Sequence, residues 1–413
     1  MEKTSGFKVK FLHIILFLIA LAAMNVINGY YYFVFIAFGF FCITPMRKIQ
    51  IDVLSVSCLL VLALSILLTS PETTASVFGV FKPFTYLLCY IMGMSLLNNE
   101  DEYLEKNNFS KFFYALVAVI AIGSFAHYFL NWTINWSIGA PAPSADITRN
   151  TIDFWTRSTV SATGQAALAC LALALAVACL FCDSGKPAKF AAGVAIVIVF
   201  AYNLILSGRT LFVLLFILVL IAFLHRMKME KKGKLKQVLL FVLVIAAVIL
   251  LFRLDFLGVR SYFEQSPLYE RFFVEESSTG LTEDSRGERK LFYLQNMLDY
   301  PGGGAKMHDQ VGYAHDIFLD TYDHYSVFAL LAMIVFLANT VVHFVRCITD
   351  KTLPFVLRQI VLCVYMAVYL EFMVEPILMG MPWLFACFCL IDGYLSRILM
   401  SQKELQQKRV SSI

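Results

Sequence analysis

One histidine and a small group of cations are the residues of this chain best suited to chemistry. His315 stands in the polar segment 312–316, Gly-Tyr-Ala-His-Asp, shortly before an apolar run. A neutral imidazole accepts a proton near pH 7, so His315 is a candidate general base, with His308 and His324 as nearby competitors. The alternative is a histidine with a purely structural role.

Four basic residues are candidates for binding an anion. Arg286, Arg289 and Lys290 share one face of the first turn of a predicted helix, where free N–H groups and the helix dipole also attract negative charge. Arg209 lies in a Leu-Ser-Gly-Arg-Thr turn between two apolar runs, and its guanidinium suits bidentate phosphate binding. The alternatives are a salt-bridged helix start for the cluster and an arginine that reaches lipid phosphates for Arg209.

The composition indicates that the helices which position these residues lie in a membrane. Of the 413 residues, 60% are hydrophobic and only 15% are charged, whereas soluble domains average about 25% charged residues. The apolar runs are long enough to cross roughly 30 Å of hydrocarbon at about 1.5 Å per residue. We therefore expect an all-α polytopic protein with a single transmembrane domain, residues 1–413. Its predicted spans number about twelve and cover 11–27, 30–45, 51–69, 77–97, 109–130, 160–182, 188–206, 210–225, 237–252, 325–346, 355–375 and 377–398.

Charge placement predicts the topology. The basic segment 226–236 should be cytoplasmic, and alternation of the spans then puts both termini in the cytoplasm. Two long connections, 131–159 and 253–324, are then extracytoplasmic. The second is inserted between helices 9 and 10 and should carry an amphipathic helix over about 286–299, ended by a proline and three glycines at 301–304.

Several absent motifs narrow the chemistry. The outer loops contain no Asp-x-Asp motif, and the chain has no HExxH, no Cys/His metal-ligand spacing and no Walker A sequence. The cysteines lie in or beside apolar spans, which gives no disulfide framework. We therefore expect no metal and no cofactor. A reaction at the outer face must use an activated substrate, and a lipid diphosphate sugar requires mainly neutralisation of its leaving group.

Two stretches, 207–223 and 285–336, carry a family resemblance. The first is a Ser-Gly-Arg turn that opens an apolar helix; the second has Arg286, a helix, a Pro-Gly-Gly-Gly break and then His315 before an apolar helix. This arrangement resembles the O-antigen ligase and polymerase family of bacterial envelope glycosyltransferases. The chain departs from the family pattern at Asp316, where Asn, Gln or Ser is usual, at Ser326, where glycine is usual, and at Lys290, where tryptophan is usual.

The resemblance implies a GT-C-like fold and a metal-independent transfer reaction. It implies that Arg209 and Arg286 bind the diphosphate of an undecaprenyl-linked donor and that His315 acts on the acceptor hydroxyl. We add Arg289 to the diphosphate site because it shares a helix face with Arg286. The expected supporting residues are Asp316, Lys290 and Glu375.

We therefore expect a polysaccharide polymerase, for O-antigen or capsule, in the bacterial cytoplasmic (inner) membrane with its active site facing outside. It would transfer a glycan from an undecaprenyl-diphosphate donor to the hydroxyl of a lipid-linked repeat unit. The alternative is a ligase that uses lipid A core or another acceptor. A lipid-linked oligosaccharide flippase ranks third, because transporters place polar residues near the midplane. Expected partners are the donor, the acceptor, membrane lipid and a chain-length regulator, with no nucleic acid.

Overall fold

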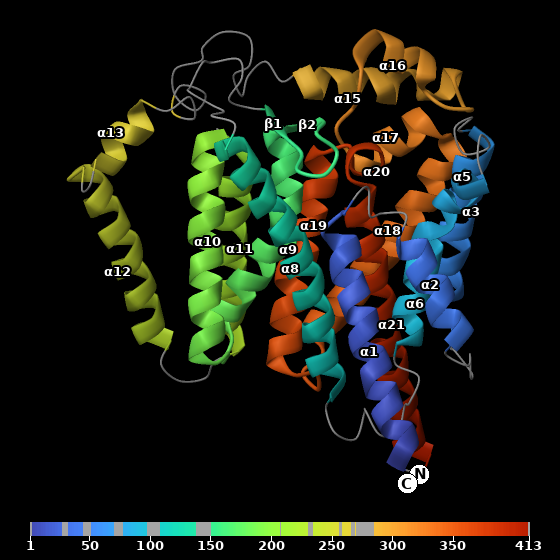
Figure 1. Cartoon of the computed structure of the whole chain (residues 1–413), viewed down its shortest axis with the longest axis horizontal. Coiled ribbons are helices and arrows are strands. Elements are labelled where there is room, and N and C mark those ends of the chain that lie inside the picture. Colours follow the sequence, from blue (N-terminus) through green and yellow to red (C-terminus); the bar gives the residue numbers. More distant parts are fainter. Residues whose placement is uncertain are drawn as a thin grey trace.

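The computed structural model is a bundle of long helices with several short elements gathered at one end (Figure 1). Both termini lie at the opposite end (Figure 1). We call the end that carries α15, α16 and the strands β1 and β2 the upper face. The structure describes residues 2–26, 32–43, 51–69, 77–96, 108–137, 150–206, 208–229, 234–255, 258–265, 269 and 285–411.

Seven helices in the described part of the chain are long and apolar enough to cross a membrane. They confirm the prediction of an all-α membrane protein, because a helix satisfies its own backbone hydrogen bonds in lipid. These seven are α8 (Asn108–Ser137), α9 (Ala162–Phe181), α10 (Lys186–Leu206), α11 (Thr210–Met229), α18 (Val327–Thr349), α19 (Phe355–Val374) and α21 (Pro382–Ser411).

The structure does not reproduce the predicted count of twelve spans. The other five predicted segments are helical, and three of them are shorter apolar helices within the described residues: His13–Ala23, Tyr32–Cys42 and Val53–Thr69. A 12-residue helix such as α2 rises only about 18 Å, well short of the hydrocarbon thickness. The segment 77–97 is divided, with Pro83 at the break. These elements are α1 (Glu2–Ala23), α2 (Tyr32–Ile43), α3 (Val53–Thr69), α5 (Val77–Phe81) with η2 (Lys82–Phe84) and α6 (Thr85–Ser95), and α12 (Lys234–Arg253).

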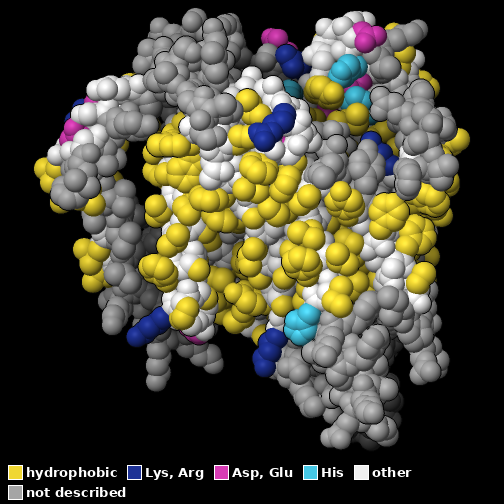
Figure 2. All heavy atoms as spheres, viewed as in Figure 1, with side chains coloured by type: hydrophobic (Ala, Val, Ile, Leu, Met, Phe, Trp, Pro, Cys, Tyr) yellow, Lys and Arg dark blue, Asp and Glu magenta, His cyan; other side chains and the backbone are white. Residues whose placement is uncertain are grey.

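The outer surface of the bundle is apolar around its middle. Figure 2 shows hydrophobic side chains covering this band, while basic side chains appear near its upper and lower margins. Large side chains such as Phe190, Phe216 and Phe328 are 75%, 68% and 68% exposed. Contiguous apolar surface on this scale is unfavourable in water and favourable in lipid. The exposed band therefore supports a membrane-embedded protein.

The centre of the bundle is formed by α9, α19 and α21. In their most apolar windows, 83%, 72% and 89% of the residues are buried, whereas only 28% are buried in α10 and α11. Helix α21 packs closely against α6 through two glycines. A Cβ at Gly93 would lie 2.2 Å from the carbonyl oxygen of Leu390, and a Cβ at Gly393 would lie 2.2 Å from that of Tyr90. Only glycine permits this approach of the two backbones.

The upper face also carries a small antiparallel hairpin within the first predicted outer loop. Strands β1 (Asn150–Ile152) and β2 (Thr159–Ser161) pair with Thr151 opposite Val160. Asp153 closes the turn: its Oδ1 accepts from the Thr156 N–H at 2.8 Å, and its Oδ2 lies 2.6 Å from His127 Nε2 on α8. The hairpin is thus attached to the end of α8, and Ser161 caps α9 directly after it.

The close contact between α6 and α21 leads to a prediction about the stability of the protein. Gly93→Ala should lower the apparent Tm of the detergent-solubilised protein, because the added methyl group must displace a backbone carbonyl; overpacking costs about 1–3 kcal/mol or more. Gly193→Ala in α10 is the matched control, since a Cβ there meets nothing within 4 Å. The control should be neutral or slightly stabilising, because alanine is the better helix former. Equal Tm values for the two variants would refute the contact.

Candidate functional site

His315 lies on the upper face in a short connection between two helices. Helix α16 (Ala305–Val311) precedes it and α17 (Ile317–His324) follows it. The φ angle of His315 is 59°, in the left-handed region that a residue with a side chain rarely adopts. Such a conformation persists only where the surroundings impose it, and it is common at functional sites. The histidine side chain is half-buried.

Two aspartates impose this conformation. Asp316 is the N-cap of α17, where its Oδ1 accepts hydrogen bonds from the N–H groups of Phe318 at 3.1 Å and Leu319 at 2.8 Å. Asp320 is buried one turn later, and its Oδ1 accepts from the Ala314 N–H at 3.0 Å. The backbone of His315 is therefore held immediately before and immediately after the residue.

The carboxyl of Asp320 titrates near physiological pH. Burial, followed by the negative charges of Asp316 and Asp323, raises the pKa of Asp320 to about 7, although the hydrogen bond from Ala314 acts in the opposite direction. Its second oxygen, Oδ2, is buried without a hydrogen-bond partner in the described part of the chain. The residue that shapes the His315 connection therefore changes its protonation near pH 7.

The predicted cationic helix lies against this connection. Helix α15 (Ser285–Asn296) crosses the upper face (Figure 1) and places Lys290 Nζ 3.2 Å from Asp316 Oδ2. The same ammonium donates a hydrogen bond to the carbonyl oxygen of Met373, at the end of α19, at 3.1 Å. Arg289 lies beside it, with Nη1 3.9 Å from the Cβ position of Gly312. The structure thus brings together Arg289, Lys290, His315 and Asp316.

Arg289 differs from Lys290 in its bonding. It is half-buried, and no ion pair or hydrogen bond joins its guanidinium to another side chain among the residues the structure describes. Lys290 is occupied by Asp316 and by Met373. Of the two cations, Arg289 is therefore the one with hydrogen-bond donors available to an anionic ligand.

The structure gives less detail on Arg286 and Arg209, the other two predicted diphosphate-binding residues. Arg286 belongs to α15, but its side chain is outside the described residues. Arg209 is half-buried just before α11, on a turn fixed by Asn203, whose Nδ2 donates to the Gly208 carbonyl oxygen at 2.7 Å. A Cβ at Gly208 would lie 2.5 Å from Asn203 Oδ1, so a larger residue there would displace the Asn203 side chain.

The expected supporting residue Glu375 is buried at the C-terminal end of α19. Its N–H donates to the Glu371 carbonyl oxygen at 3.0 Å, and its own carbonyl accepts from Ile377 at 2.9 Å, which leads into α20 (Ile377–Gly380). Lys290 reaches the same helix end through Met373. Glu375 therefore belongs to the scaffold below α15.

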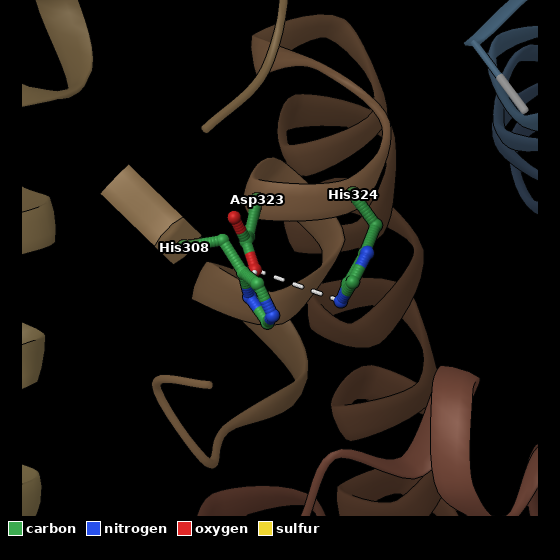
Figure 3. Close-up of side chains that lie close together, drawn as sticks. All are labelled: His308, Asp323 and His324. Atoms are coloured by element: carbon green, nitrogen blue, oxygen red, sulfur yellow. Dashed lines mark hydrogen bonds and ion pairs between the residues drawn. The ribbon is translucent and has the colours of Figure 1, made fainter. Parts of the chain in front are cut away.

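A second group of polar side chains on the upper face was not predicted from the sequence. His308 Nδ1 lies 2.8 Å from Asp323 Oδ2, and His324 Nε2 lies 3.5 Å from the same oxygen (Figure 3). Burial lowers the pKa of His324, and burial also raises the pKa of Asp323 against the opposing effect of both imidazoles. His308 is separated from the other two by the His315 connection, so no short motif reveals the group, and only the fold assembles it.

Comparison with known proteins adds no family assignment. No protein-family model matches the chain, and no curated protein matches it either. A function is therefore supported by the placement of Arg289, Lys290 and His315 and by the membrane-embedded fold that carries them.

The raised pKa of Asp320 makes a prediction about pH. The pKa of Asp320 is about 7 in the folded protein, above the ordinary value of 3.8. The protonated carboxyl therefore contributes stability at low pH, and this contribution is lost as pH rises from about 4 through 7. Asp320→Asn keeps an oxygen for the Ala314 N–H but carries no charge. The Tm of the variant relative to the wild type should therefore be higher at pH 8 than at pH 5. A difference that is the same at both pH values would contradict the assignment.

Proposed function

We propose that this protein is a polysaccharide polymerase that transfers a glycan from an undecaprenyl-diphosphate carrier to a hydroxyl of a lipid-linked repeat unit. The observation that carries the proposal is the contact between α15 and the His315 connection. The connection that carries His315, the proposed proton acceptor, lies against the helix that carries Arg289, whose guanidinium has hydrogen-bond donors available. This pairing is what displacement of a diphosphate by a hydroxyl requires.

In the proposed reaction, His315 takes the proton of the acceptor hydroxyl. The hydroxyl oxygen forms a new bond with the anomeric carbon of the donor sugar. The bond between that carbon and the diphosphate oxygen breaks, and its electron pair leaves with undecaprenyl diphosphate. Attack opposite the leaving group inverts the anomeric configuration. Arg289, with Arg286 and Arg209, neutralises the diphosphate, so the transfer needs no metal ion.

Lys290 has a positioning role in this proposal. Its ammonium contacts Asp316 and the end of α19, so it holds α15 over the His315 connection instead of binding substrate. Asp316 completes the link because the same carboxylate caps α17. Of these two neighbouring cations, Arg289 is then the one that touches the substrate.

The proposal includes an orientation and a finer architecture. The upper face would be extracytoplasmic in the bacterial cytoplasmic membrane. The basic residues Arg226 and Lys228, in the last turn of α11, together with both termini, lie at the other end, as the positive-inside tendency favours. We further propose that the shorter apolar helices join the seven long ones in about twelve spans of a GT-C-like fold. A ligase with the same donor and another acceptor, such as lipid A core, would use the same geometry.

One observation favours a second candidate, a lipid-linked oligosaccharide flippase. A polar cluster is buried inside the bundle: His343 Nδ1 lies 3.1 Å from Asp392 Oδ2, His343 Nε2 lies 3.5 Å from Asp52 Oδ2, and Tyr90 donates to Asp52 at 2.7 Å. Ionisable groups at membrane depth commonly serve transport. We favour the polymerase because His343 lies toward the lower end of α18. The cluster is therefore far along the helix from the His315 connection at the upper face.

The catalytic assignment is tested with His315→Ala and Arg289→Lys in a host that lacks the chromosomal gene. His315→Ala should reduce polymer formation by about 10²–10⁴-fold, the usual contribution of a general base. Arg289→Lys keeps the charge but loses bidentate geometry, so we expect a smaller loss. His13→Ala, an exposed histidine of α1, is the matched control and should behave as the wild type.

Analysis of surface glycan and lipid-linked intermediates separates the candidate functions. Single repeat units on the carrier at the outer face, with no long chains, support the polymerase. Full-length chains that stay on the carrier support the ligase, and repeat units trapped at the cytoplasmic face support the flippase. Normal glycan from His315→Ala would disprove the catalytic role of this residue.

A further inference from the structure

Three potential metal ligands converge on the upper face beside the candidate active site. His308 comes from α16, while Asp323 and His324 come from the last turn of α17. One ligand atom from each of the three side chains lies within 4.8 Å of the others. Figure 3 shows the two imidazole rings directed toward the Asp323 carboxylate. The convergence is local, but it joins two separate helices.

The bonding of the three side chains is incomplete. The Asp323 side chain is 0% exposed, so its charge has little access to water. His324 Nε2 is buried and lacks a hydrogen-bond partner within the described residues, although it lies 3.5 Å from Asp323 Oδ2. A buried nitrogen that faces a carboxylate oxygen without a hydrogen bond is unfavourable, and a cation between the two atoms removes the cost.

The donor set indicates which cation fits. Two imidazole nitrogens and one carboxylate oxygen suit Zn²⁺, whereas Mg²⁺ and Ca²⁺ prefer oxygen ligands. Zinc bonds of about 2.0–2.2 Å in a tetrahedral arrangement place neighbouring ligand atoms roughly 3.3–3.6 Å apart. The observed separations from Asp323 Oδ2, 2.8 Å and 3.5 Å, lie near this range, and the two histidine nitrogens, within 4.8 Å of each other, must move together to complete the site. His308 and His324 remain 30% and 20% exposed, which leaves an approach for the ion and for a water ligand.

We propose that His308, Asp323 and His324 bind one Zn²⁺ ion, with water as the fourth ligand. The ion fastens α16 to the end of α17 and so closes the segment that contains His315. Tyr313 packs against the cluster, with its ring centroid 4.6 Å from that of His308 and 5.5 Å from that of His324. The site is structural, takes no part in glycosyl transfer and does not depend on the proposed function.

Zinc titration of the purified full-length protein tests the site. The protein carries a purification tag without histidines and is treated with EDTA and dialysed before titration. Wild type should bind one equivalent of Zn²⁺, measured by competition with a fluorescent chelator and by elemental analysis. His308→Gln and His324→Gln should each weaken binding by about 10-fold or more, and the double variant should lose it. His13→Gln is the matched control and should bind as the wild type does.

A thermal measurement on the wild type covers the case in which the double variant does not fold. Zn²⁺ should raise its apparent Tm by a few degrees at about 100 times the Kd, because the ion binds only the folded arrangement. Mg²⁺ at the same concentration should produce no shift. The proposal is wrong if Zn²⁺ and Mg²⁺ act equally on Tm, or if the double variant folds and binds Zn²⁺ as tightly as the wild type. Loss of glycan synthesis does not enter either readout.

Discussion

The Asp316 carboxylate joins the parts on which the candidate site depends. One oxygen caps α17, and the other pairs with Lys290 of α15, which in turn reaches the end of α19. A helix cap contributes about 1 kcal/mol, and a partly exposed ion pair contributes about 0–1 kcal/mol. These are small energies beside those of the packed bundle. Apolar packing also holds α15: Tyr293 is buried in a cluster with Ala314, Leu319 and Tyr322, and its hydroxyl donates a hydrogen bond to the Gly312 carbonyl oxygen at 3.0 Å. The contacts of Asp316 therefore set the orientation of a helix that this packing keeps in place.

The sequence predicts the elements that have a long apolar run or a residue that ends a helix. Long apolar runs identify α8 to α11, α18, α19 and α21, and the Pro-Gly-Gly-Gly break places the end of the surface helix near Asp299, where η5 (Met297–Asp299) ends. The number of spans could not be obtained in this way. Hydropathy does not show that Pro83 divides one segment, or that α2 has only 12 residues. The cluster of His308, Asp323 and His324 was also missed, because backbone reversal at the left-handed Gly312 and His315 brings its members together.

Lys290 and Asp316 balance each other's charge beside His315. In the structure these two side chains form an ion pair of 3.2 Å. Each alone would leave an uncompensated charge beside the histidine, whereas together they are neutral. The pair was not evident from the sequence, since α15 and α17 are separated by η5, the glycine break and α16.

The charges around His315 can be followed one by one, and they favour an anionic ligand. Helix α17 and its cap contain three carboxyl groups, which would repel an anionic ligand. Lys290 neutralises Asp316, protonation near pH 7 reduces the charge of Asp320, and the two imidazoles, with zinc where it is bound, face Asp323. Arg289 carries no such partner in the described part of the chain. Its guanidinium is therefore the cation available to an anion beside the connection, and rising pH should weaken anion binding by ionising Asp320.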